Sequence, residues 1–279
     1  MVPTRSQWSS VAIALLVFSR SAQAADLQAK TVAAFDRYVR ITEARMAAEV
    51  ADAGRFLWVD SLADPRRATA LDELRRGGLV IERLATRDGE QKIDVPGGLI
   101  HHWVGVVFVP GAGVDQAVAL LQDYDRHAEI YKPGIARSKL LARDGDTFRV
   151  QLRFVMKKVI TVVMNTENEA RFTHPRRDRA YSRIYSTRIT EIEHADTPEE
   201  FENPVGHDGG YLWRLYSYWR FLERDGGTYV QCESISLSRG IPIGFGWLIG
   251  PFVTSIPRES LVFILETTRA RLARRASPR

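Results

Sequence analysis

The chain has 279 residues, of which 45% are hydrophobic and 26% are charged. These fractions are typical of a folded globular protein and exclude a largely disordered or collagen-like chain. The formal net charge is only +5, which is too small to indicate nucleic-acid binding. A single cysteine, Cys232, excludes an internal disulfide framework and a multi-cysteine metal site.

The first 24 residues have the order of a secretory signal peptide. Arg5 supplies a positive charge, residues 11–18 form an apolar run, and Ala22-Gln23-Ala24 is a small-x-small cleavage site. The apolar run has eight residues, whereas a membrane-spanning helix needs roughly 20. We therefore expect cleavage after Ala24 and a periplasmic or secreted protein. The alternative is an uncleaved N-terminal anchor.

Residues 25–98 are expected to form a helical extension that precedes the main domain. Asp26 is the expected N-cap of a helix that runs to about residue 53, because apolar residues recur there at helical spacing. A second, short helix is expected to start at Asp64-Pro65 and to end at Gly77-Gly78. Pro96-Gly97-Gly98 breaks the pattern, and we place the domain boundary there, with the main domain at 99–275.

After residue 98 the hydrophobic pattern changes to the two-residue period of strands. A helix is expected at 114–124, and a long one opens at Pro257 and runs to about Arg274. Asp225-Gly226-Gly227 is a hairpin turn signal, and 194–210 is expected to be an acidic loop. The expected strands are 100–109, 147–156, 157–166, 179–192, 211–223 and 228–238.

This order of elements predicts an α+β fold. An antiparallel sheet must bury one face, and the last helix and the short helical region after residue 114 are the elements available to cover it. A bent antiparallel sheet wrapped around a long C-terminal helix, the helix-grip arrangement, meets this need. Such a sheet is expected to leave a space between itself and the helix.

Several stretches between Trp103 and Leu272 carry a resemblance to a known superfamily. They are Asp123-Tyr124 with Tyr131-x-Pro133, Tyr218-Trp219-Arg220-Phe221, Gly226-Gly227-Thr228-Tyr229-Val230 and Pro257-Arg258-Glu259-Ser260-Leu261. Over about 175 residues the chain resembles the START-like (SRPBCC, helix-grip) superfamily, which includes lipid-transfer START domains, polyketide cyclases and coenzyme Q-binding proteins. The resemblance implies a cavity for a hydrophobic ligand. It does not specify the ligand, and some members of the superfamily are enzymes.

The hairpin formed by 211–223 and 228–238 has one face without charged residues. Whether the two-residue turn is Asp225-Gly226 or Gly226-Gly227, each odd-numbered residue of one strand faces an even-numbered residue of the other. We expect the uncharged face to point inward, where its small residues leave room for a ligand. The alternative is that the last helix packs tightly against this face and nothing binds. The residues expected to line the cavity from this face are Trp213, Trp219, Phe221, Cys232, Ser234 and Ser236.

Two further residues are expected to line the cavity. Phe154 belongs to an alternating row in 147–156, and Arg188 belongs to a row of small and polar residues in 179–192. If that second row faces inward, Arg188 is placed to bind an anionic head group. Outward exposure of Arg188 is the alternative. Arg220 and Glu233 lie on the opposite face of the hairpin, and we favour a solvent-facing ion pair over a polar site.

The segment 241–257 contains no charged residue. We interpret 241–256 either as a lid or lip that touches a membrane surface, or as a buried crossover into the last helix. The histidines lack metal-ligand spacing, and adjacent His101 and His102 must point to opposite faces of a strand. His127 with Asp123 and Asp125 is a weaker candidate for a general base.

The sequence therefore predicts an exported binding or carrier protein for a hydrophobic small molecule, with a lipid as the expected class. The first alternative is an enzyme of the cyclase or hydrolase type that uses the same cavity. The second is a non-catalytic interaction module whose cavity is filled. We assign no catalytic residue, no metal ligand, no cofactor and no nucleic-acid partner.

Overall fold

A computed structural model describes residues 25–158, 160–240 and 246–276. The predicted signal peptide, residues 1–24, and the first part of the 241–256 segment lie outside these residues. None of the helices described combines the length and hydropathy that crossing a membrane needs.

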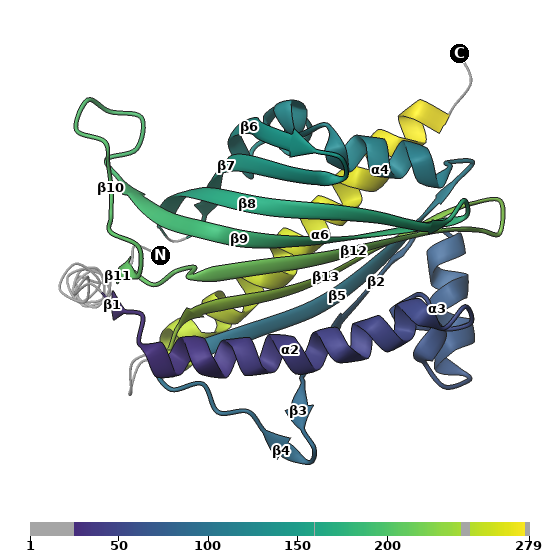
Figure 1. Ribbon diagram of the computed structural model, residues 1–279, viewed down its shortest axis with the longest axis horizontal. Helices are drawn as coiled ribbons and strands as arrows, with labels where there is room; N and C mark the ends of the chain where they lie inside the picture. Colours follow the sequence, from purple (N-terminus) through teal and green to yellow (C-terminus); the bar gives the residue numbers. More distant parts are fainter. Residues whose placement is uncertain (1–24, 159, 241–245, 277–279) are drawn as a thin grey trace, which may run out of the picture.

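A nine-stranded antiparallel sheet dominates the described part of the chain (Figure 1). Eight strands follow one another in the order β2-β5-β13-β12-β9-β8-β7-β6, and the short strand β10 pairs with β9. Their bounds, in chain order, are β2 (Leu79–Arg83), β5 (Gly98–Pro110), β6 (Ile135–Asp144), β7 (Thr147–Lys157), β8 (Thr161–Arg176), β9 (Arg179–Glu193), β10 (Phe201–Glu202), β12 (Arg214–Arg224) and β13 (Gly227–Arg239). Two small two-stranded sheets lie apart from this sheet, β1 (Ala25–Asp26) with β11 (His207–Asp208) and β3 (Arg87–Asp88) with β4 (Gln91–Lys92).

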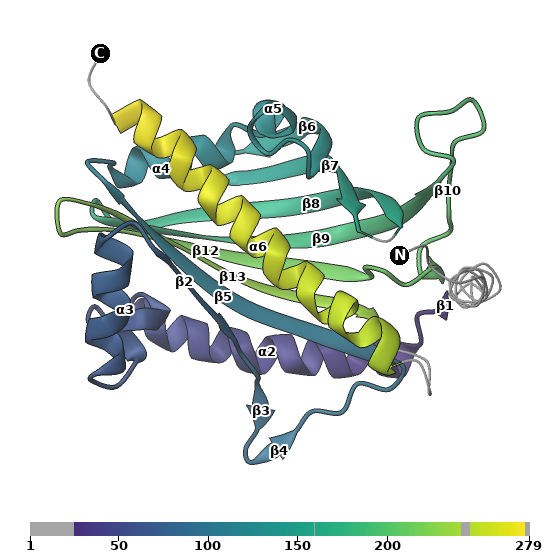
Figure 2. The same cartoon turned by 180° about the vertical axis from the view of Figure 1, so that it is seen from behind.

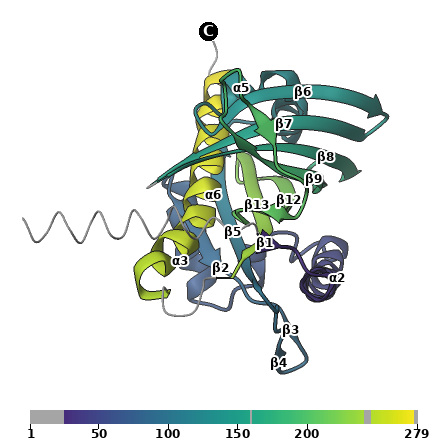
Figure 3. The ribbon, with the colours of Figure 1, turned by 90° about the vertical axis from the view of Figure 1, so that its left-hand side faces the viewer.

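The sheet wraps around the long helix α6 (Gly246–Ala276), which crosses its inner face diagonally (Figure 2, Figure 3). Between β5 and β6 the chain forms α4 (Val114–Gln122), η2 (Tyr124–Arg126) and α5 (His127–Ile130), which close one end of the same face. The core on this face includes Leu261, Leu265 and Leu272 of α6. The predicted α+β helix-grip fold is therefore confirmed.

The last helix begins at Gly246, eleven residues before Pro257, where we expected it to open. Proline removes one helical hydrogen bond and costs about 3 kcal/mol in a helix interior. Pro257 nevertheless lies inside α6, which extends on both sides of it. Most of the segment interpreted as a lid or crossover is thus helical.

The region before residue 98 contributes to the sheet and also covers its outer face. Helix α2 (Ala29–Ala51) lies along that outer face (Figure 1) and buries Phe35, Tyr38 and Met46. The shorter helices η1 (Trp58–Ser61) and α3 (Arg66–Arg75) follow, and β2, which we did not predict, pairs with β5. Asp26 belongs to β1, and Gln28 occupies the N-cap of α2, so the N-cap prediction was wrong.

The polar face of the hairpin is buried beneath α2, and our expectation of a solvent-facing pair was wrong. Arg220 is 2% exposed and Glu233 is 0% exposed. Arg220 Nη1 lies 2.8 Å from a Glu49 carboxylate oxygen and donates to the Phe56 carbonyl at 2.8 Å. His102 Nε2 lies 2.7 Å from Glu233 Oε1, and Arg45 pairs with the same carboxylate. A helix placed on the outer face therefore converts a surface pattern into a buried polar network.

The β12–β13 hairpin has the register expected from its turn. Arg214 pairs with Leu237 and Trp219 with Cys232, so the numbers of facing residues sum to an odd number. Asp225 and Gly226 both have positive φ, at 58° and 75°, as a two-residue hairpin loop requires. The predicted strand 157–166 is instead the first part of β8, which begins at Thr161, and β6 was not predicted.

We predict that Glu233→Gln lowers the free energy of unfolding by about 3 kcal/mol, because it removes the charge of a buried carboxylate that pairs with Arg45 and His102. Burial alone would raise the pKa of Glu233, but the bond to His102 and the charges of Arg45 and Arg220 lower it, so the carboxylate is ionised at neutral pH. Urea denaturation at pH 7 measures the loss. The control is Glu82→Gln, which removes a partly exposed pair with Arg66 and should cost less than about 1 kcal/mol. Equal losses in both variants would contradict the prediction.

Candidate functional site

A cavity of about 1160 Å³ lies between the inner face of the sheet and α6. Its walls come from β7, β8, β9, β12 and β13, from α6, and from the helical segment between β5 and β6. Ligand sites in proteins usually enclose about 300 to 1,000 Å³. The space is therefore large enough for an entire small molecule, and Trp219 lines it without filling it.

Small side chains on the hairpin open this space. Cys232, Ser234 and Ser236 of β13 and Ser217 of β12 line the cavity. These positions alternate with the buried polar network of the outer face, because successive side chains of a strand point to opposite sides. Phe154 of β7 lines the cavity from the opposite wall. Five of the eight residues expected from the sequence are thus cavity-lining: Trp219, Cys232, Ser234, Ser236 and Phe154.

Phe221 and Trp213 do not line the cavity. Phe221 is fully buried and stacks on Trp219, with ring centroids 6.3 Å apart. Trp213 precedes β12, so the alternation of that strand does not extend to it. It packs in the outer cluster that contains Phe35 and Ile235, and its Nε1 donates to Asp208 Oδ1 at 3.1 Å.

Arg188 points away from the cavity because β9 contains a bulge. Glu167 of β8 pairs with Arg188, but the next residue, Asn168, pairs with Ser186, so Thr187 is an extra residue. A single extra residue reverses which side chains face inward beyond it. Arg188 therefore lies on the outer face, where it forms an ion pair with Glu202. The predicted anchor for an anionic head group is absent from the cavity.

The same bulge turns Glu191 into the cavity, a residue that the sequence analysis missed. Glu191 pairs with the cavity-lining Met164 and is 4% exposed. Its Oε2 accepts a hydrogen bond from Gly209 N at 2.7 Å, and its Oε1 accepts one from Tyr211 N at 2.9 Å. Burial, reinforced by the charge of nearby Asp208, raises the pKa of Glu191 to about 7. An alternating pattern gives no signal for such a residue unless the bulge is known.

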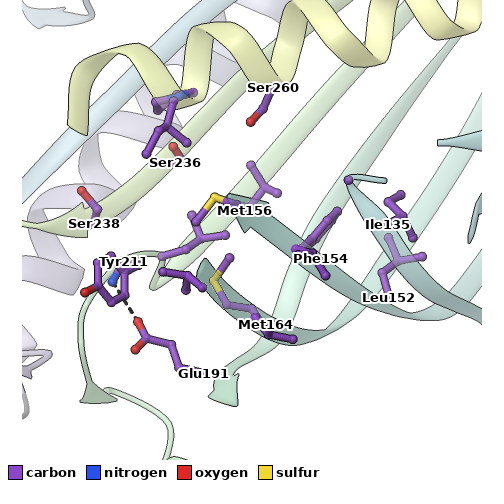
Figure 4. Close-up of a pocket in the computed structure, with 18 of the residues that line it drawn as sticks. Ile135, Leu152, Phe154, Met156, Met164, Glu191, Tyr211, Ser236, Ser238 and Ser260 are labelled. Carbon is purple, nitrogen blue, oxygen red and sulfur yellow. Dashed lines mark hydrogen bonds between the residues drawn. The ribbon is translucent and has the colours of Figure 1, made fainter. Parts of the chain in front are cut away.

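The cavity has a polar end and an apolar end (Figure 4). Glu191, Tyr211, Ser236 and Ser238 lie at one end, where β9, β13 and the 207–212 segment meet. Aliphatic and aromatic side chains line the other end, and the labelled ones are Ile135, Leu152 and Phe154. This arrangement matches an amphipathic molecule, because each part of it would meet groups of its own polarity.

The histidines of this region form hydrogen bonds within the fold. His101 faces the cavity and His102 the outer face, as expected, and His101 Nε2 lies 2.9 Å from the Ser238 hydroxyl. Burial lowers the pKa of His101 and of His127 to about 4, so both are neutral at pH 7. His127 Nε2 donates to the Leu121 carbonyl at 3.0 Å.

Among the residues that the structure describes, no group of three or more His, Cys, Asp or Glu side chains is arranged to hold a metal ion.

We predict that stability depends on pH through Glu191. Because its folded-state pKa is raised from an ordinary value near 4.5 to about 7, the unfolded chain ionises first as the pH rises. This group alone should lower the free energy of unfolding by about 2 to 3 kcal/mol between pH 5 and pH 8. Denaturation of Glu191→Gln should lack this loss, whereas Glu169→Gln, on the exposed side of β8, should retain it. Parallel profiles for Glu191→Gln and the unmodified protein would refute the prediction.

Comparison with known proteins bears on the fold alone. No protein-family model matches the sequence, and no curated protein matches it. A STAR-related lipid transfer protein from Xanthomonas axonopodis is 17% identical, with a TM-score of 0.44 over 68% of this chain and 98% of that one. The Zhui aromatase/cyclase from a Streptomyces species is 14% identical, with a TM-score of 0.43 over 64% and 97%. A START superfamily protein from Mycobacterium smegmatis is 14% identical, with a TM-score of 0.40 over 62% and 97%. The strand order and the position of α6 give this chain a helix-grip fold.

Proposed function

We propose that this protein binds and carries a hydrophobic small molecule, with a lipid as the expected class. One observation carries the proposal, the cavity of about 1160 Å³ whose walls are mainly apolar. Protein interiors are packed with few voids larger than a water molecule. A folded chain that keeps so large an apolar space therefore has room for a ligand in its core.

The energetics of such binding are favourable. Burying about 400 Å² of apolar ligand surface contributes about 10 kcal/mol at roughly 25 cal/mol per Å². Association costs at least about 4 kcal/mol. The remainder of about 6 kcal/mol corresponds to a Kd of tens of micromolar. Hydrogen bonds at the polar end would tighten binding further and determine specificity.

Our proposal includes export and contact with a membrane surface. The signal-peptide pattern of residues 1–24 supports export to the periplasm or the outside of the cell. The uncharged segment 241–256 is the proposed membrane contact, and Ile256 at its end lines the cavity. A segment that both borders the cavity and lacks charge is suited to the passage of an apolar molecule.

A second candidate function is an enzyme of the cyclase or hydrolase type. One observation favours it, because Glu191 lines the cavity and burial raises its pKa to about 7, within the range useful to a general acid or base. Loss of turnover in Glu191→Gln with ligand binding retained would identify an enzyme. The third alternative, an interaction module with a filled cavity, is disfavoured by the volume of the cavity.

Native mass spectrometry tests the carrier proposal directly. Protein purified from a host that contains membranes should show an additional mass from a bound lipid or other apolar molecule, and organic extraction should release it. A protein that carries nothing and fails to bind fatty acids, alcohols, sterols or quinones would contradict the proposal.

We predict that Ser234→Phe reduces ligand binding at least tenfold, because the ring would occupy the cavity that Ser234 lines. Displacement of an apolar fluorescent probe measures the effect, and thermal unfolding checks that the variant is folded. Ser61→Phe, at an exposed position outside the cavity, is the control and should bind normally. Ser217→Phe provides a second blocking variant on the neighbouring strand. Unchanged binding in both blocking variants would place the ligand elsewhere.

A further inference from the structure

Two buried carboxylates lie together at the polar end of the cavity. Glu191, near the end of β9, is 4% exposed, and Asp208, in β11, is 3% exposed. Both line the cavity, and the charge of Asp208 contributes to the raised pKa of Glu191. Two acids buried side by side are costly for a fold, which makes them candidates for a binding role.

Hydrogen-bond donors of the 207–213 segment satisfy only some of the carboxylate oxygens of this pair. Asp208 Oδ1 accepts hydrogen bonds from Gly210 N at 2.8 Å and from Trp213 Nε1 at 3.1 Å. Asp208 Oδ2 is buried and has no hydrogen-bond partner among the described residues. An unpartnered carboxylate oxygen inside a protein loses its hydration without compensation. The Oδ2 atom is thus an acceptor without a donor, on a residue that lines the cavity.

The geometry points to a ligand whose polar end donates hydrogen bonds, a hydroxyl or an ammonium group, held by Asp208 and Glu191. This inference rests on the proposed function and specifies the class of ligand. The chain of the ligand would extend toward Ile135, Leu152 and Phe154 at the apolar end (Figure 4). Ser236 and Ser238 line the polar end and would complete the contacts of the head group.

The charges around the pair disfavour an anionic head group at this position. Glu193 follows on the same strand and adds a third carboxylate to this end of the cavity. His207 pairs with Asp26, at 2.6 Å between Nδ1 and Oδ1, on the two-stranded β1–β11 sheet. Among the described residues, the lysines and arginines that line the cavity are Lys157, Lys158 and Arg239, and Lys158 is paired with Glu259. A carboxylate held by Arg239 is the competing arrangement, and the following experiment separates the two.

The experiment compares ligands that share one chain length and differ only in the head group. Decylamine, decanol and decanoate bury the same apolar chain, so differences in affinity report on the head. Competition with an apolar fluorescent probe at pH 8 gives the three Kd values for the unmodified protein. We expect decylamine and decanol to bind at least tenfold more tightly than decanoate.

Variants test which residues cause this preference. Asp208→Asn removes one charge while keeping an oxygen for Gly210 N and Trp213 Nε1. Glu191→Gln also removes one charge, but it keeps an acceptor oxygen for only one of Gly209 N and Tyr211 N. Each should reduce the ratio of decanoate Kd to decylamine Kd at least fivefold. Glu169→Gln removes a carboxylate from the exposed side of β8, outside the cavity, and should leave the ratio unchanged. Comparing decylamine with decanol distinguishes an ammonium head from a hydroxyl head.

The outcomes separate this inference from the proposed function. If none of the three compounds displaces the probe and none binds by native mass spectrometry, the proposed function fails and the inference fails with it. If all three bind with equal affinity, the cavity is a hydrophobic site without head-group recognition, and only the inference is overturned. Tighter binding of decanoate would also overturn it and would assign the head group to Arg239.

Discussion

The close contact between α6 and β5 determines where the cavity lies. A Cβ atom at Gly105 would lie 2.5 Å from Leu265 Cδ1, so the helix can rest on the strand here only because the strand has no side chain. The sheet continues from β5 over six further strands, the last of which is β6, and it curves along the way (Figure 3). A straight helix cannot follow a curved sheet along its whole width. The space that remains between them is the cavity of about 1160 Å³, bordered by the small residues of β12 and β13.

The outer face of the same sheet is held by a different kind of interaction. Helix α2 covers the hairpin strands with apolar side chains and with the charged groups of Arg45 and Glu49, which meet Glu233 and Arg220. These charges are buried and paired, so removing one partner is much more costly than replacing the entire network with apolar groups. The hairpin is consequently held by α2 on its outer face. The serines and Trp219 on its inner face are held in place as a cavity wall, while the residues between them anchor the helix.

A single extra residue gives the cavity its chemical character. Thr187 shifts the register of β9 against β8, so Arg188 points outward and Glu191 points inward. The cavity thereby has a buried carboxylate near the end of β9 and lacks the guanidinium group that a regular strand would have turned inward. Together with Asp208 this carboxylate makes one end of the cavity acidic, whereas the other end is lined by aliphatic and aromatic residues. The polarity of the cavity thus follows from strand register more than from composition.

Local pattern was sufficient to predict much of this protein from its sequence alone. The two-residue period identified β5, β7, β9, β12 and β13, helical spacing identified α2 and α4, and the Asp225-Gly226 turn set the hairpin register that places Ser234 and Cys232 opposite α6. These features depend on residues close together in the sequence, so the local sequence pattern predicts them. The tertiary structure alone decided that α2 buries Arg220 and Glu233, that α6 starts at Gly246, and that Glu191 replaces Arg188 in the cavity. The burial of Arg220 and Glu233 and the register of β9 depend on contacts between different segments of the chain, where the free energy of packing outweighs local preference and leaves no periodic signal.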